Sequence, residues 1–262
     1  MSADSSSLRH PHTPTQPPTV LHYLIPERHW LALALGGAAI LMTLLGIVIG
    51  QPLWRAALPG TFLFTAAVLV RWYYDRSTYG QVIALMVALL TFQGGHGLEH
   101  LAQWVQYHLL GYTARASSGL ISAANSEWVH FLWNWGVLLV MLRLYWLGLR
   151  NPWAYVMLFW STAHTAEHTY LFVRHLEVLQ ILKAYGEAGV TAQGLPGIFG
   201  NDGWLARSPT TAGSWVCTIP GLTTATRLDV HFWWNVGETI LLMIAAYTHI
   251  HRNPQYNPAV VQ

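Results

Sequence analysis

The sequence GHGLEHLAQWVQYH at residues 95–108 places His96, Glu99 and His100 inside an otherwise apolar stretch. On an α-helix, positions i, i+3 and i+4 share one face, so these three side chains point toward one partner. A charged side chain at mid-membrane costs ~2.5 to 3.5 kcal/mol unless it is paired or binds a cation. The stretch therefore predicts a helix with one functional polar face.

The same pattern recurs as AHTAEHTYLFVRH at residues 163–175, which again contains His-x-x-Glu-His. Each copy precedes a connection and then a second shared phrase, VHFLWNWG at 129–136 and VHFWWNVGE at 230–238. Besides apolar residues, the two copies share His, Glu and Asn, which are costly in a membrane helix. Their presence in both copies favours a functional site over a duplication without a function. We expect an internally duplicated helical hairpin, with its copies at residues 79–149 and 152–250.

The composition is typical of an integral membrane protein. Of 262 residues, 53% are hydrophobic and only 9% are charged, whereas soluble domains carry roughly 25% charged residues. A bilayer core of about 30 Å is crossed by about 20 helical residues. We predict an all-α integral membrane fold with about six transmembrane helices. The expected spans are residues 30–50, 57–73, 79–110, 127–149, 152–180 and 229–250.

These spans form one expected transmembrane domain, residues 29–252, between a disordered polar tail at 1–28 and a tail at 253–262. Two connections are long, residues 111–126 and 181–228, and the second is expected to act as a lid. Arginines are more frequent beside the short connections on the N-terminal side. The positive-inside rule then predicts cytoplasmic termini in a cell membrane, with the site toward the opposite face.

Two simple counts narrow the chemistry. The single Cys217 excludes an internal disulfide and a cysteine-based metal cluster. A net charge of +2 without a basic stripe predicts that nucleic acid is not a partner.

The duplicated hairpin predicts a four-helix metal-binding core. Its ligand-type groups suit about two metal ions with three or four protein ligands each. Mixed imidazole and carboxylate ligands favour iron, with copper or zinc as alternatives. Haem is less favoured, because histidines one turn apart with Glu between them crowd a small volume. The predicted metal ligands are His96, Glu99, His100, His130, His164, Glu167, His168 and His231.

Four further residues are predicted to support a bound cofactor. Asn134 and Asn235 would orient ligands by hydrogen bonds, and Glu238 extends the second motif by one turn. His175 falls on the same face as His168 and could add a ligand or an outer contact. The tryptophans of the second phrase are expected in the aromatic belt at the membrane interface.

In kind, the arrangement is similar to the histidine-box membrane di-iron hydroxylases and desaturases, which gather many histidines from several helices around two irons. The boxes here read HxxEH and HFxWN, where that group has HxxxH and HxxHH patterns. No residue role is therefore carried over from those enzymes.

The leading hypothesis is an integral-membrane oxidoreductase of the hydroxylase, desaturase or oxidase type with a dinuclear metal centre. It would act on a lipophilic substrate from the bilayer, with electrons from a donor protein or a quinol. Glu99 and Glu167 would be the catalytic carboxylates, bridging the ions or balancing their charge. The alternatives are a non-enzymatic membrane subunit that binds metal or haem, and a zinc-dependent membrane lipid hydrolase.

Overall fold

The structure, a computed structural model, describes residues 30–121, 126–187 and 194–253, and every regular element within those ranges is a helix. The tails predicted at 1–28 and, apart from Asn253, at 253–262 lie outside the described residues.

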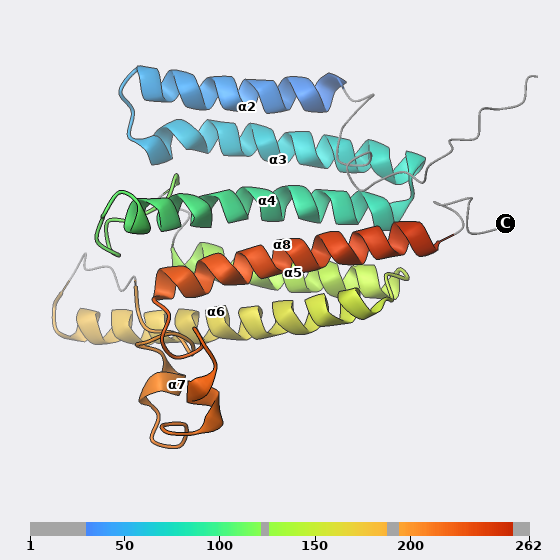
Figure 1. The fold of residues 1–262 in the computed structure, drawn as a ribbon. Coiled ribbons are helices and arrows are strands. Elements are labelled where there is room, and N and C mark those ends of the chain that lie inside the picture. Colours follow the sequence, from blue (N-terminus) through green and yellow to red (C-terminus); the bar gives the residue numbers. More distant parts are fainter. Residues whose placement is uncertain (1–29, 122–125, 188–193, 254–262) are drawn as a thin grey trace, which may run out of the picture.

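The described chain contains six long helices that alternate in direction (Figure 1). They are α2 (Trp30–Val48), α3 (Leu53–Thr78), α4 (Gln81–His108), α5 (Glu127–Trp146), α6 (Pro152–Ala184) and α8 (Arg227–Arg252). The short helix α7 (Trp204–Arg207) and a 3-10 turn, Trp215–Thr218, lie in the connection between α6 and α8. Three helices, α2, α3 from Arg55 and α4, are long and apolar enough to cross a membrane. That α5, α6 and α8 also cross it remains a prediction.

Local sequence explains where two of the site-bearing helices begin. The Asn151 side chain accepts a hydrogen bond from the Ala154 N–H at 3.0 Å, and Pro152 follows it as the first helical residue of α6. The Thr226 side chain accepts from the Asp229 N–H at 3.2 Å at the start of α8. Both caps satisfy helix-terminal donors that would otherwise be unpaired.

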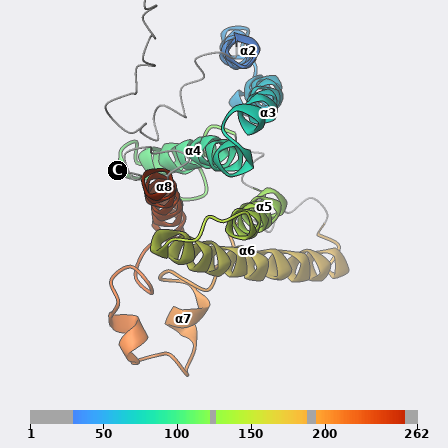
Figure 2. The ribbon, with the colours of Figure 1, turned by 90° about the vertical axis from the view of Figure 1, so that its right-hand side faces the viewer.

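Helices α2 and α3 pack closely through small residues. A Cβ added to Gly46 would lie 2.7 Å from the Ala56 Cα, and one added to Gly60 would lie 2.2 Å from the Thr43 Oγ1. Small residues let helix backbones approach in this way, which is a common means of helix association in membranes. The pair lies outside the ring of helices that carries the motifs (Figure 2).

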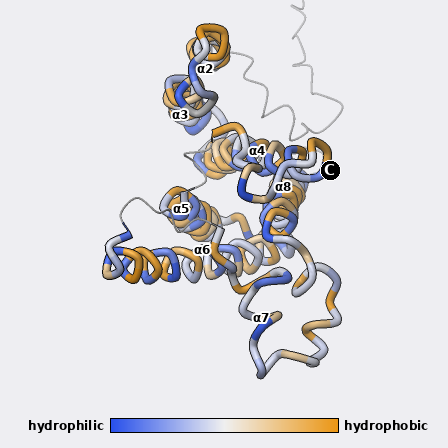
Figure 3. Tube along the Cα trace, turned by 90° about the vertical axis from the view of Figure 1, so that its left-hand side faces the viewer, coloured by the Kyte–Doolittle hydropathy of each residue, from blue (hydrophilic) through white to orange (hydrophobic). Residues whose placement is uncertain are grey.

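Helices α4, α8, α6 and α5 contact one another in that order as a ring, and α3 packs on α4 (Figure 2). Along its axis the ring has two layers. The apolar layer contains Met86, Met141, Met157 and Leu242, each at most 1% exposed. The polar layer holds the motif histidines and lies toward the end where both long connections leave the helices (Figure 1). In Figure 3 the helices carry long apolar stretches, while the connection around α7 is paler and partly hydrophilic.

Candidate metal centre

Six histidine side chains from four helices form one largely buried cluster in the polar layer. His96 Nε2 lies 3.2 Å from His100 Nε2 on α4, and His164 Nε2 lies 3.2 Å from His168 Nε2 on α6. Both pairs come from HxxEH motifs, whose i, i+4 spacing places the rings one turn apart. The facing helices add one histidine each. We define the first triad as His96, His100 and His130, and the second triad as His164, His168 and His231.

The two triads contact each other. The rings of His130 and His168 are nearly parallel with centroids 5.1 Å apart, and those of His100 and His231 have centroids 5.9 Å apart. Within the triads, the centroid distance is 5.4 Å from His100 to His130 and 4.9 Å from His168 to His231. The structure therefore brings all six predicted histidines together.

The first triad has donor atoms spaced closely enough for one ion. The ligand-type nitrogen atoms of its three histidines all lie within 4.8 Å of one another. Nitrogen ligands bind transition metals at about 2.0–2.1 Å, so opposite donors of one ion stand about 4 Å apart. Small side-chain rotations would close this set of imidazoles around a single cation.

In each triad, a backbone carbonyl holds the histidine of the HFxWN motif. His130 Nδ1 lies 3.3 Å from the carbonyl oxygen of Ser126, and His231 Nδ1 lies 2.7 Å from that of Arg227. A carbonyl oxygen can only accept, so each Nδ1 carries the proton and each Nε2 keeps its lone pair. His231 Nε2 is buried without a hydrogen-bond partner among the described residues, which leaves a ligand-ready atom in the cluster.

Side-chain oxygens orient one HxxEH histidine in each triad. His100 Nδ1 lies 2.8 Å from Gln103 Oε1, and His164 Nδ1 lies 3.0 Å from Glu238 Oε1. These contacts also place the proton on Nδ1 and turn Nε2 toward the neighbouring histidine. Outer contacts of this kind fix the tautomer of metal-binding histidines and raise their basicity.

Gln93 joins this arrangement, although its sequence position did not single it out. It is fully buried and donates to Glu238 Oε2 at 2.6 Å and to Asn235 Oδ1 at 2.9 Å. Its own Oε1 accepts from the Trp133 indole N–H at 3.2 Å. One feature of the sequence could have indicated its role: Gln93 lies three residues before His96, on the same helical face.

Two of the motif tryptophans cover the first histidine of each HxxEH motif. Trp133 stacks on His96 with centroids 4.8 Å apart at 30°, and Trp234 stacks on His164 at 5.2 Å and 11°. The expectation that the tryptophans lie in an interfacial belt is therefore wrong for this pair. Each lies three residues after the histidine of its own HFxWN motif, on the same helical face, and so points inward. Trp233, by contrast, is 60% exposed.

The two predicted asparagines are buried beside the histidines. Asn134 Nδ2 donates to the His130 carbonyl, and Asn235 Nδ2 donates to the His231 carbonyl, both at 2.9 Å. Both bonds lie within one helix, so each amide steadies the backbone of its motif histidine. His175 lies seven residues beyond His168 on α6 and is half-buried, and its role stays a prediction.

The two motif carboxylates bind loop backbone. Glu99 accepts from the N–H of Leu120 at 2.9 Å and from that of Ile121 at 3.0 Å. Glu167 accepts from the Ile198 N–H at 2.8 Å. We call these contacts the loop clamps. Their oxygens already have partners in both long connections, and a role as metal ligands stays a prediction.

A glycine makes each loop clamp possible. A Cβ on Gly119 would lie 2.1 Å from Glu99 Oε1, and one on Gly197 would lie 1.8 Å from Glu167 Oε1. The clamped segments read Gly-Leu-Ile at 119–121 and Gly-Ile-Phe at 197–199, a similarity that the sequence alone does not reveal. It is too short to stand out without the carboxylates that bind it.

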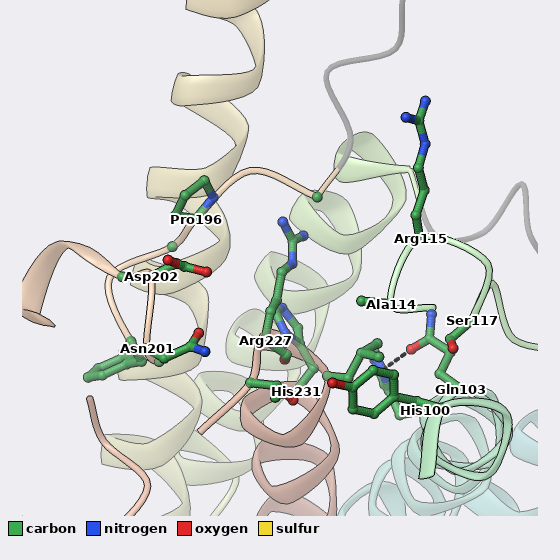
Figure 4. Close-up of a pocket in the computed structure, with 18 of the residues that line it drawn as sticks. His100, Gln103, Ala114, Arg115, Ser117, Pro196, Asn201, Asp202, Arg227 and His231 are labelled. Atoms are coloured by element: carbon green, nitrogen blue, oxygen red, sulfur yellow. Dashed lines mark hydrogen bonds between the residues drawn. The ribbon is translucent and has the colours of Figure 1, made fainter. Parts of the chain in front are cut away.

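A cavity of about 790 Å³ lies above the cluster at the loop end of the ring (Figure 4). His100, His130 and His231 reach it from below, and the segments around residues 114–118 and 194–203 form its walls. Arg227 stands at its centre in Figure 4. The three histidines are thus accessible from this end of the molecule.

Arg227 connects three elements at that cavity. Its guanidinium donates to Glu127 Oε1 on α5 at 2.6 Å and to the carbonyl oxygen of Leu195. Glu127 is only 2% exposed, and its Oε2 has no hydrogen-bond partner among the described residues. The sequence gives no local signal for this ion pair, because its two residues lie 100 positions apart.

No family model, curated protein or solved structure matches the chain. The site is therefore interpreted from its own residues.

Proposed function

We propose that the protein is an integral-membrane oxidoreductase whose six clustered histidines bind about two transition-metal ions, one at each triad. The observation that carries the proposal is the cluster itself, six imidazoles from four helices with Nε2 atoms 3.2 Å apart within each HxxEH pair. The lone pairs of two Nε2 atoms repel each other, so a proton or a cation must lie between the two nitrogens of each pair. Two ions supply that compensation throughout the cluster.

The outer faces of the remaining helices support a membrane location for the whole ring. Leu139 on α5 is 58% exposed, Phe159 on α6 is 75% exposed and Ile240 on α8 is 50% exposed. Large apolar side chains exposed on all three helices are unfavourable in water. We therefore propose that α5, α6 and α8 cross the bilayer together with α2, α3 and α4.

The donor set favours copper over iron. The motif carboxylates occupy the loop clamps, which leaves imidazoles facing one another in both triads. Carboxylate-rich sites suit iron, whereas sites built from imidazole alone also suit copper and zinc. Of these metals, copper cycles between oxidation states and therefore fits electron transfer chemistry.

The histidines would hold the ions, and the surrounding residues have separate tasks. Glu238 and Gln103 hold the tautomers of His164 and His100, and the Nε2 atoms face inward. The loop clamps hold both connections beside the cavity at the loop end of the cluster. The cavity beside His231 leaves room for a co-substrate at the ions.

Elemental analysis of the detergent-purified protein tests this function. We expect about two copper ions per chain and an absorption spectrum that changes on reduction and reoxidation. A preparation that remains free of stoichiometric transition metal after incubation with copper, iron or zinc would contradict the proposal. An intense Soret band would instead indicate haem.

A zinc-dependent hydrolase is the second candidate, and one observation favours it. Glu127 lines the same cavity as His130 and His231, and its buried Oε2 has no hydrogen-bond partner among the described residues, so this carboxylate could accept a proton from water. Stoichiometric zinc, together with a spectrum that does not respond to reductant, would select this candidate.

A further inference from the structure

The cavity above the cluster lies among the loop segments and helix ends. Its walls come from residues 114–118 and 194–203, and its remaining lining comes from the ends of α4, α5 and α8. The apolar outer faces of the helices, such as that of Leu139, do not contribute to it. A molecule that reaches the histidines through this cavity therefore comes from the aqueous phase.

The charges that line the cavity are already paired or turned away. Arg227 is bonded to Glu127, and Asp202 accepts from Arg207 at 2.9 Å. The Arg115 guanidinium points away from the histidines in Figure 4. Two charged side chains of the lining, Arg227 and Asp202, thus have partners of opposite charge, and a third, Arg115, does not face the histidines.

The rest of the lining combines neutral donors and acceptors with the apolar groups of Ala114, Pro196, Phe199 and Leu228. Amides come from Gln103 and Asn201, and a hydroxyl comes from Tyr107. Four glycines, at positions 194, 197, 200 and 203, line the wall without side chains. The amides and the hydroxyl can bond hydroxyl and amide groups of a ligand.

One histidine connects the cavity to the proposed metal centre. His231 lines the cavity, is 6% exposed, and its Nε2 has no hydrogen-bond partner among the described residues. A buried nitrogen without a partner is unfavourable, and the metal ion proposed at the second triad would be the partner of this atom. Its position links the cavity directly to the second triad.

We infer that this cavity is a binding chamber for a small, uncharged, water-soluble molecule that carries hydroxyl groups and reaches the histidines from the aqueous loop end. The inference rests on the proposed metal function, because it names the substrate class of the same site. It replaces the lipophilic substrate that the membrane composition alone led us to expect.

Cysteine accessibility in lipid nanodiscs tests the inference. In a Cys217→Ser background, Ala114→Cys places a thiol on the cavity wall, and Leu139→Cys places one on the apolar outer face of α5. The reagent is a trimethylammonium methanethiosulfonate, which is charged and water-soluble. Asn201→Cys, on the other wall, provides a second cavity position should the first variant fold poorly.

We expect the Ala114→Cys variant to react much faster than the Leu139→Cys variant, and we expect a neutral polyol to protect its thiol. Erythritol at roughly twice its dissociation constant should slow modification about threefold. Malonate and octanol, as the anionic and lipophilic probes, should not protect. Protection by either of these but not by erythritol, or equal reaction rates of the two variants, would overturn the inference.

Metal content measured on the same nanodiscs separates the two proposals. Bound copper without polyol protection overturns the binding chamber and leaves the metal function intact. Polyol protection in nanodiscs that bind no metal contradicts the metal function and supports the chamber as a binding site.

Discussion

The two triads contain the same residue types but differ in geometry and surroundings, and among the described residues only the first brings three ligand nitrogens within 4.8 Å of one another. In both, an HxxEH pair meets one histidine from the facing motif, and a tryptophan stacks on the first histidine. In the second triad a buried carboxylate, that of Glu238, contacts His164, whereas Val137 stands at the corresponding place after the first HFxWN motif. Equivalent ligands with unequal partners should give two ions of unequal affinity.

The largest effect is expected from removing a ligand. His100→Ala or His168→Ala should lower metal content from about two ions per chain to about one or fewer, because each triad then keeps only two imidazoles. Elemental analysis of the purified variants measures it. His251→Ala, a half-buried position near the end of α8, is the control and should keep both ions. Equal metal in all three variants would refute the assignment of ligands.

Removing the one carboxylate that distinguishes the triads should affect only one ion. Glu238→Gln keeps the shape and weakens the charge-assisted contact with His164, so affinity at the second triad should fall about 10- to 100-fold. Competition with a chelator resolves the two binding steps. Val137→Ala, at the matching place, should leave both steps unchanged. If Glu238→Gln weakens both ions equally, the triads are not separate sites.

The loop clamps provide a test with a smaller effect on metal. Glu99→Gln should weaken the bonds to Leu120 and Ile121 at a cost of about 1–3 kcal/mol in local stability, while both ions remain bound. Hydrogen exchange of the connection after α4 measures the loosening, and Glu167→Gln should loosen only the connection after α6. Loss of metal as complete as that in His100→Ala would show that Glu99 is a ligand after all.

The smallest change is expected at the hydrogen bond between Trp133 and Gln93. Trp133→Phe keeps the ring on His96 but removes the indole N–H that holds Gln93, at a cost of about 1 kcal/mol. Since Gln93 also bonds Glu238, affinity at the second triad should fall about fivefold. Trp135→Phe, on the outer side of α5, is the matched control and should leave the chelator titration unchanged.

The clustering of the histidines could be predicted from the sequence, because helical geometry alone determines which side chains share a face. An i, i+4 pair must share a face, and repetition of the phrase showed which helices face each other. The role of Glu99 was harder to predict. Its side chain is rotated by about 100° around the helix axis from that of His100, so it contacts a different neighbour. Its partners, Leu120 and Ile121, depend on the path of a connection that carries no periodic pattern.

The same limit applies to the cavity and to Arg227. The pair with Glu127 joins residues 100 positions apart, and no local rule links them. Composition correctly predicted long apolar helices and so suggested a substrate from the lipid. The cavity lining depends on loop folding, which hydropathy does not describe.

The loop clamps, which depend on Gly119 and Gly197, determine where the chain tolerates an insertion. Each clamped tripeptide must meet a carboxylate whose position is fixed on a helix. An insertion beside the tripeptide would therefore shift it and break its hydrogen bonds to that carboxylate. The segment near Ala212 and Gly213 is largely exposed and lies beyond the second clamp. An epitope tag or a fluorescent reporter placed there would leave the histidines covered, and would give a handle on the protein in intact cells.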